Sequence, residues 1–306
     1  MNKKQVLEQI LGRLWQDYKD RVEYANIYAN LVEEKKGEVI NDHIALRSIK
    51  TTIPNQDSGI IPFLEIFEAF DYEVKSDYQF SSKKLSAVHL EHEDNRLPKI
   101  FVSELLVSEF AHDFDEIIKR NIASCVCKLN ENVKHQLQNL KNNDFIDDDK
   151  VNEFVDHIVD FFTRPWNPPQ RSDVYEINKF SQYAAWVLLH GNSVNHFTAY
   201  INFQKVNEWP DIETTLAALS AQGVPLKDEL EGEKGSVLRQ SASEAVTEDC
   251  QVRDAEGHLI TIPWSYAYYE FAERGFVTNP NGENVLFQGF LGEQATNLFE
   301  MTDAKK

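Results

Sequence analysis

The stretch DHIALRSI at residues 42–49, with its counterpart VNHFTAYIN at 194–202, decides the fold expected for this chain of 306 residues. Each stretch has the composition of a β-strand, and each places a histidine near its start, His43 in the first and His196 in the second. Each is followed by a helical segment and by three further strand-like runs, the last of which carries a glutamate. The sequence therefore predicts one β-α-β-β-β layout that occurs twice.

The first copy is assigned from local signals. Residues 59–70 have helical periodicity, and strand-like runs follow at 72–80, 83–93 and 97–107. The last of these runs, LPKIFVSELLV, contains Glu104. A proline stands near its start, as it does near the start of the last strand of the second copy.

The second copy repeats this order. Residues 211–223 have an acidic first turn and end at a glycine, which predicts a helix. Strands are predicted at 236–243, 248–254 and 259–271, and the last of them contains Glu270. The fold class is therefore α+β, built from paired βαβββ modules.

The rest of the chain is predicted to be helical. N-terminal helices are expected before residue 36, and a helical insertion is expected at 108–165, between the modules. We expect residues 1–306 to form a single catalytic unit, with the first module at 37–107 and the second at 190–275. The sequence gives no indication of the role of the insertion or of the oligomeric state.

Composition narrows the possible partners. Hydrophobic residues make up 42% of the chain, which is enough to bury a sizeable core. The net charge of −19 would repel a phosphate backbone, which argues against nucleic acid as a partner. No apolar run approaches the ~18 residues of a membrane span, and the N-terminus lacks the apolar core of a signal peptide. Three cysteines, Cys125, Cys127 and Cys250, fit a reducing compartment, so a cytoplasmic location is expected.

The repeat suggests a metal-binding site. If the two modules pair around one concave face, a histidine and a glutamate from each can converge there. Two histidines and one carboxylate are the ligand set of many iron(II) oxygenases, and they leave positions open for a 2-oxo acid and O2. A histidine in a strand is more often an ordinary core residue, and His43 and His196 depart from that default because both begin the first strand of a module. From the repeat alone, the choice between Glu104 and Glu270 remains open.

Arg47 follows His43 by four residues. In a strand these two side chains point to the same face, ~13 Å apart. A guanidinium at that distance could bind the far carboxylate of a dicarboxylic substrate through two parallel hydrogen bonds. The alternative is a surface salt bridge.

At these residues the chain resembles a known family, the iron(II)-dependent 2-oxoadipate dioxygenase/decarboxylases of the vicinal oxygen chelate superfamily. The resemblance covers most of the chain, from about residue 37 to 302. It is carried by HIALR (43–47), KKL and FVSELLV (within 83–107), RPW (164–166), YAAWVLLHGNSVNHFT (183–198), YYEFAER (268–274) and LFEMT (298–302).

The resemblance implies that His43, His196 and Glu270 bind Fe(II) and that Arg47 contacts the substrate carboxylate. It implies that Glu104, taken as the pseudo-symmetric fourth corner of the site, supports the structure without binding the metal. The implied reaction converts 2-oxoadipate and O2 to 2-hydroxyglutarate and CO2, a step of lysine breakdown.

Two features leave alternatives open. Longer bacterial members carry additional C-terminal sequence that shapes the substrate pocket and has no match here, so the 2-oxo-acid class is implied rather than one particular acid. Other metal-dependent enzymes of the superfamily, namely isomerases, lyases and extradiol dioxygenases, would use all four corners, Glu104 included. A non-enzymatic ligand-binding module is the third possibility.

Overall fold

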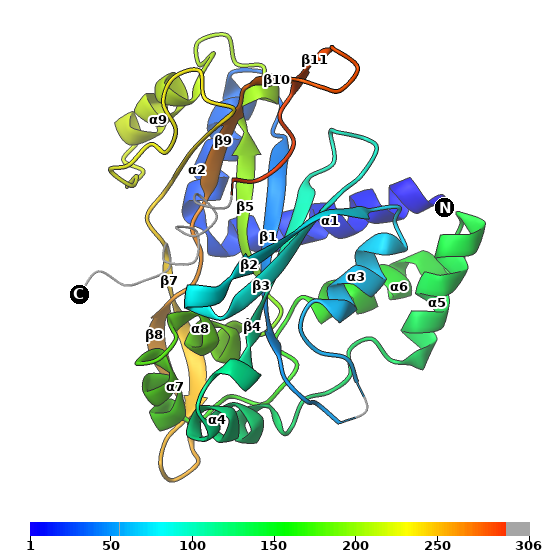
Figure 1. Cartoon of the computed structure of the whole chain (residues 1–306), viewed down its shortest axis with the longest axis vertical. Helices are drawn as coiled ribbons and strands as arrows, with labels where there is room; N and C mark the ends of the chain where they lie inside the picture. Colours follow the sequence, from blue (N-terminus) through cyan, green and yellow to red (C-terminus); the bar gives the residue numbers. More distant parts are fainter. Residues whose placement is uncertain (55, 292–306) are drawn as a thin grey trace.

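A mixed seven-stranded β-sheet forms the centre of the computed structural model, which describes residues 1–54 and 56–291 (Figure 1). The two histidine-bearing strands pair antiparallel in the middle of this sheet. In spatial order the strands are β2 (Glu73–Phe80), β3 (Leu85–Glu91), β4 (Lys99–Leu106), β1 (Asn41–Lys50), β5 (Val194–Tyr200), β9 (Glu270–Arg274) and β6 (Leu238–Ala242). The α+β class is confirmed, and the β1–β5 junction joins two similar halves, as expected for a duplicated unit.

Helices surround the sheet. The N-terminal pair is α1 (Lys3–Arg21) and α2 (Glu23–Glu34), and the crossover helices of the two halves are α3 (Ile61–Glu68) and α9 (Ile212–Ala221). Between the halves lie α4 (His112–Ile122), α5 (Glu131–Asn143), α6 (Asp148–Phe161), α7 (Arg171–Asn178) and α8 (Gln182–His190). Short 3₁₀ turns occupy Ser81–Lys83, Val107–Glu109 and Ile201–Phe203. Within the described ranges, no helix is long and apolar enough to cross a membrane.

Two hairpins stand outside the main sheet at opposite ends of the molecule (Figure 1). One is formed by β7 (Thr247–Arg253) and β8 (Leu259–Ser265), the other by β10 (Phe276–Thr278) and β11 (Asn284–Leu286). The LFEMT motif at 298–302 lies outside the described residues.

The hairpin β7–β8 corrects the prediction for the second module. A continuous strand was expected over 259–271, but β8 ends at Ser265 and β9 begins at Glu270. In the intervening run the carbonyl of Tyr266 accepts a hydrogen bond from the Trp186 indole, and that of Tyr268 accepts one from the Tyr18 hydroxyl. Side chains from α8 and α1 thus take carbonyls that a neighbouring strand would otherwise bind, so the strand is interrupted.

The two faces of the central strands have different surroundings. Ile44 of β1 and Phe197 of β5 are register partners, and the rings of Trp15 and Tyr18 from α1 pack on Phe197 with centroids 5.0 Å away. That face is the hydrophobic core beneath the N-terminal helices. Because side chains alternate along a strand, His43 points to the opposite face.

Candidate metal centre

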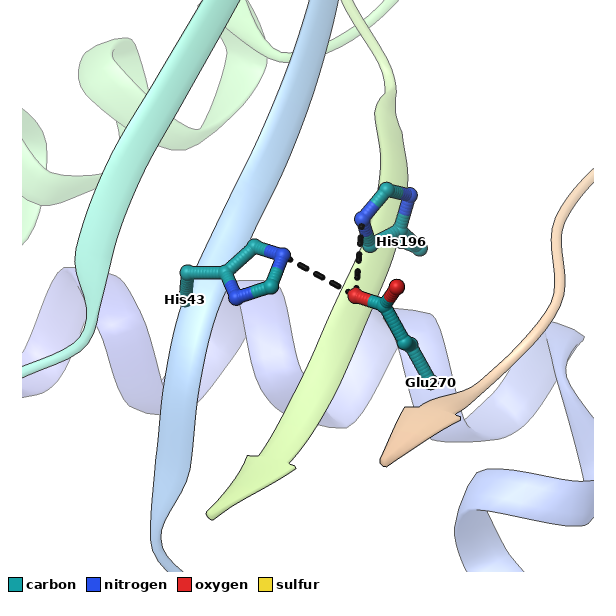
Figure 2. A group of neighbouring side chains, drawn as sticks. All are labelled: His43, His196 and Glu270. Carbon is teal, nitrogen blue, oxygen red and sulfur yellow. Dashed lines mark ion pairs between the residues drawn. The ribbon is translucent and has the colours of Figure 1, made fainter. Parts of the chain in front are cut away.

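Three side chains from distant parts of the chain meet on that opposite face. His43 comes from β1, His196 from β5 and Glu270 from the first position of β9 (Figure 2). One ligand atom of each lies within 4.8 Å of the others. The Nε2 atoms of His43 and His196 lie 3.0 and 3.5 Å from the same carboxylate oxygen, Glu270 Oε2. All three residues are at most 1% exposed.

Strand register explains the convergence. Glu270 is the parallel partner of Thr198, two positions after His196, so it lies beside the histidine on the same face. Across the β1–β5 junction, His196 is the antiparallel partner of Ala45, two positions after His43. Register shifts flank this pairing on both sides, and bulges of this kind re-aim side chains locally.

The three groups fit a divalent metal ion. Ligand atoms about 2.1 Å from a metal and adjacent on one octahedral face stand roughly 3 Å apart, close to the separations from Glu270 Oε2. The buried Nε2 of His196 makes no hydrogen bond to any residue that the structure describes, although buried polar atoms almost always have a partner. Two imidazoles and a carboxylate suit iron(II) by their ligand chemistry.

The electrostatics of the two histidines differ. Burial, followed by the nearby His43 and Arg47, holds the pKa of His196 well below its ordinary value, so its ring is neutral, the form that binds a metal. Burial by itself lowers the pKa of His43, but hydrogen bonds to Asp42 and Glu270 outweigh it and raise that pKa. A metal ion bound at Nε2 of His43 would require that nitrogen to be unprotonated.

Two polar side chains orient the carboxylate. Thr198 Oγ1 donates to Glu270 Oε2 at 2.6 Å, and Gln240 Nε2 from β6 donates to Oε1 at 3.2 Å. The ring of Tyr268 stacks on His196 with centroids 4.7 Å apart. Thr198 and Gln240 could not be assigned from the sequence, because only the strand register brings them to Glu270.

Asp42 supports His43 from the other side. Its Oδ2 lies 2.8 Å from His43 Nδ1, and its two oxygens accept hydrogen bonds from Arg274. Burial alone would raise the pKa of Asp42, but Arg274 and then Lys99 hold it well below its usual range. The carboxylate is therefore ionised. The sequence offered one signal for this role, the position of Asp42 directly before His43.

Arg47 is buried, at 2% exposure, so its surface salt-bridge alternative is wrong. Its guanidinium lies over the rings of Tyr183 and Trp186 from α8, 5.1 and 5.3 Å from the ring centroids. Arg47 and His196 line one small cavity, together with Ala45, Leu46, Phe101, Ser103 and Asn195. A molecule bound at His196 would therefore lie next to a fixed positive charge.

Glu104 lies outside this cluster. In register it faces Ser48, whereas the position equivalent to Glu270, opposite the second residue after the histidine, holds Phe101. The assignment of Glu104 to a symmetric fourth corner is therefore wrong. Its oxygens accept hydrogen bonds from the Lys50 ammonium, the Ser86 hydroxyl and the Ile60 amide, where α3 begins.

The Glu104→Gln variant should lose stability and keep the metal centre. The substitution removes the charge from three hydrogen bonds, and a fall of about 1–3 kcal/mol in the free energy of unfolding is expected. Denaturant unfolding and metal titration of the same preparation measure both effects, with Glu270→Gln as the matched comparison. A loss of metal binding in Glu104→Gln equal to that in Glu270→Gln would contradict this placement.

In a second cluster of possible metal ligands, the carboxylate is already bound by an arginine. His190, Glu248 and Cys250 also have ligand atoms within 4.8 Å of one another. The carboxylate of Glu248, however, accepts two hydrogen bonds from the Arg21 guanidinium, at 2.7 and 3.1 Å. A fixed cation on its carboxylate disfavours a metal ion there. His89 is also engaged, with Tyr78 and Glu91 on its two ring nitrogens.

Comparison with known proteins points to one family. A family model described as 2-oxoadipate dioxygenase/decarboxylase matches residues 9–305. A rice protein named 2-oxoadipate dioxygenase/decarboxylase, chloroplastic/amyloplastic, is 26% identical over 96% of this chain and 78% of its own length. An Arabidopsis thaliana protein named 2-oxoadipate dioxygenase/decarboxylase, chloroplastic, is 24% identical over 87% of this chain and 66% of its own length.

Solved structures share the fold. A putative glyoxalase superfamily protein from Ralstonia eutropha JMP134 has a TM-score of 0.81 at 23% identity, covering 90% of this chain and 84% of that one. A rice hydroxyglutarate synthase, solved in complex with 2-oxoadipate, has a TM-score of 0.73 at 24% identity, covering 98% and 93%. A putative hydrolase from Shewanella frigidimarina NCIMB 400 has a TM-score of 0.69 at 29% identity, covering 92% and 96%.

Proposed function

The chain belongs to the 2-oxoadipate dioxygenase/decarboxylase family, and from this premise we propose that it is an iron(II)-dependent enzyme. Its substrates would be O2 and 2-oxoadipate or a similar 2-oxo acid, and its products from 2-oxoadipate would be 2-hydroxyglutarate and CO2. These two products account for every atom of 2-oxoadipate and O2. The observation that carries the proposal is the buried cluster of His43, His196 and Glu270, in which Nε2 of His196 has no hydrogen bond to the described part of the chain. The reaction would be a step of lysine breakdown.

The protein's part would be to hold the metal ion and to orient its ligands. Bound iron(II) would supply the chemistry that makes O2 reactive toward the 2-oxo acid. His43, His196 and Glu270 would hold the ion, and a set of three protein ligands would leave it able to bind substrates as well. Thr198 and Gln240 fix the Glu270 carboxylate in place.

Arg47 would determine the substrate specificity. In a dicarboxylic 2-oxo acid, the second carboxylate stands at the far end of the carbon chain from the 2-oxo acid group. The Arg47 guanidinium lines the cavity that begins at His196 and can pair with a second carboxylate there. The position of this cation supports a dicarboxylic 2-oxo acid, in agreement with the substrate in the names of the plant relatives.

Oxygen uptake tests the function. Metal-free protein is loaded with Fe(II) without oxygen, and uptake is then followed with 2-oxoadipate, 2-oxoglutarate and a monocarboxylic 2-oxo acid. We expect fastest uptake with 2-oxoadipate, and one CO2 released per O2 consumed. Zn(II)-loaded protein is the control and should consume no O2.

The other outcomes are also informative. Uptake with only a different 2-oxo acid would keep the chemistry and change the substrate. Bound metal without uptake for any of the three acids would remove the dioxygenase assignment and favour an isomerase or lyase, which uses the metal without O2.

A further inference from the structure

Arg274, at the end of β9, joins the metal centre to a later part of the chain. It is 2% exposed. Its Nε and Nη2 donate to the two carboxylate oxygens of Asp42, at 2.5 and 2.8 Å. Its Nη1 donates to the carbonyls of Phe287 and Gly289, both at 2.9 Å. All three nitrogens of one buried guanidinium are therefore engaged.

Asp42 connects Arg274 to His43, a predicted metal ligand. Its Oδ2 lies 2.8 Å from Nδ1 of His43, while Nε2 of the same ring lies 3.0 Å from Glu270. A carboxylate that accepts from Nδ1–H fixes the tautomer and the rotation of the imidazole. Metal-binding histidines almost always donate their other ring N–H in this way.

The segment 287–290, which we call the strap, lies on the same histidine. The ring of Phe290 meets the ring of His43 edge to face, with centroids 4.9 Å apart, and it also packs against Phe101 at 5.1 Å. Gln288 of the strap lines a groove between the β2–β3 edge of the sheet and the β10–β11 hairpin. The strap thus reaches from a surface groove to the metal centre, and its hold on Arg274 keeps Phe290 against His43.

We propose that Arg274 is a positioning residue of the metal centre, which clamps Asp42 and the strap and so fixes the His43 ring with Nε2 toward the metal. This inference rests on the proposed function, because it concerns the ligand geometry of a bound metal ion. If Arg274 and Asp42 formed only an ordinary buried ion pair, breaking it would lower the stability of the fold and leave metal affinity unchanged. A positioning pair would change metal affinity beyond any effect on folding.

Asp42→Asn gives the direct test. The asparagine keeps the shape of the side chain, removes its charge and weakens both its hold on Nδ1 and its pairing with Arg274. The matched control is Asp173→Asn, because Asp173 is also a buried carboxylate, held by Nε of Arg120 at 2.8 Å. Metal-free protein is titrated with Co²⁺, and the melting temperature and the Co²⁺ absorption spectrum are recorded for each variant.

We expect Asp42→Asn to bind Co²⁺ about 10–100-fold more weakly than the wild type, with an altered spectrum. Asp173→Asn should melt at a lower temperature and bind Co²⁺ as the wild type does. Wild-type affinity and spectrum in Asp42→Asn would overturn the inference and leave the proposed function standing. A wild-type protein that binds neither Co²⁺ nor Fe²⁺ would overturn both.

Arg274→Lys tests the relay itself. Lysine keeps the charge but cannot hold both carboxylate oxygens and two carbonyls in one plane. Because Asp42, and not the strap, contacts His43 Nδ1, we expect Arg274 to act on metal binding through Asp42. The double variant Asp42→Asn/Arg274→Lys should therefore bind Co²⁺ about as weakly as the worse single variant. Losses that multiply in the double variant would overturn the relay.

The inference can also be tested on the wild-type protein, so this test does not depend on the folding of a variant. In Zn²⁺-loaded protein, ¹⁵N spectra of the histidine rings should show His43 protonated at Nδ1 and metal-bound at Nε2. A metal-bound or unprotonated Nδ1 would overturn the inference.

Discussion

The His196→Ala variant should fold normally and lose stoichiometric Fe(II) binding, and with it all oxygen uptake. Among residues 1–54 and 56–291, the Nε2 of His196 makes no hydrogen bond, so its removal leaves no polar partner there unsatisfied at that atom. The other predicted ligands, His43 and Glu270, keep their partners Asp42 and Thr198. Removal of one of three protein ligands should weaken metal binding by more than the ~10–100-fold typical of a residue that only supports a ligand.

The measurement is a titration of metal-free protein with Fe(II) without oxygen, followed by metal analysis after desalting. His190→Ala is the matched control, because His190 is also buried, packs against the ring of Trp186 and pairs with Glu248. His190→Ala should retain one Fe(II) per chain. Stoichiometric iron in His196→Ala, with a normal melting temperature, would count against the assigned site.

The second large effect is expected at Arg47. Arg47→Lys should bind metal as the wild type does and lose activity toward dicarboxylic 2-oxo acids. Lysine replaces a planar fork by a point charge, so at least one charge-assisted hydrogen bond to the distal carboxylate is lost. Such bonds are worth about 1.5–3 kcal/mol each, and kcat/KM for 2-oxoadipate should fall roughly 10–100-fold. In Arg47→Ala, kcat/KM for 2-oxoadipate should fall further than in Arg47→Lys.

A pair of substrates provides the internal control for Arg47. A monocarboxylic 2-oxo acid has no distal carboxylate, so its kcat/KM should change little in either variant. Equal losses in kcat/KM for both acids would mean that Arg47 maintains the shape of the site, through its contacts with Tyr183 and Trp186, and does not bind the distal carboxylate. The metal titration used for His196→Ala separates this outcome from a loss of metal.

Local sequence signals predicted many of the elements correctly. Helix α8 ends at His190 and is capped by Gly191, whose positive φ of +63° is adopted by glycine without strain. Helix α9 begins after Asp211, which accepts a hydrogen bond from the Thr214 amide. These signals act over a few residues, so they can be read without the fold.

The errors share a different origin. The interruption between β8 and β9 depends on hydrogen bonds from Trp186 and Tyr18, both far away in the sequence. Spacing along the chain suggested that Glu104 matches Glu270, whereas strand register gives that position to Phe101. A shift of a few residues along a strand moves a side chain several ångströms from the site, and sequence spacing does not record it.

By itself the sequence determined the repeat, the strands that carry His43 and His196, and the face shared by His43 and Arg47, because strand alternation is a local property. The resemblance to the family already implied that Glu270, and not Glu104, joins the two histidines. The contact of these three side chains and the engagement of Asp42, Thr198, Gln240 and Arg274 were decided only by the tertiary structure. The reason is physical: pairing between strands about 150 residues apart fixes which side chains are neighbours, and no local pattern contains that register.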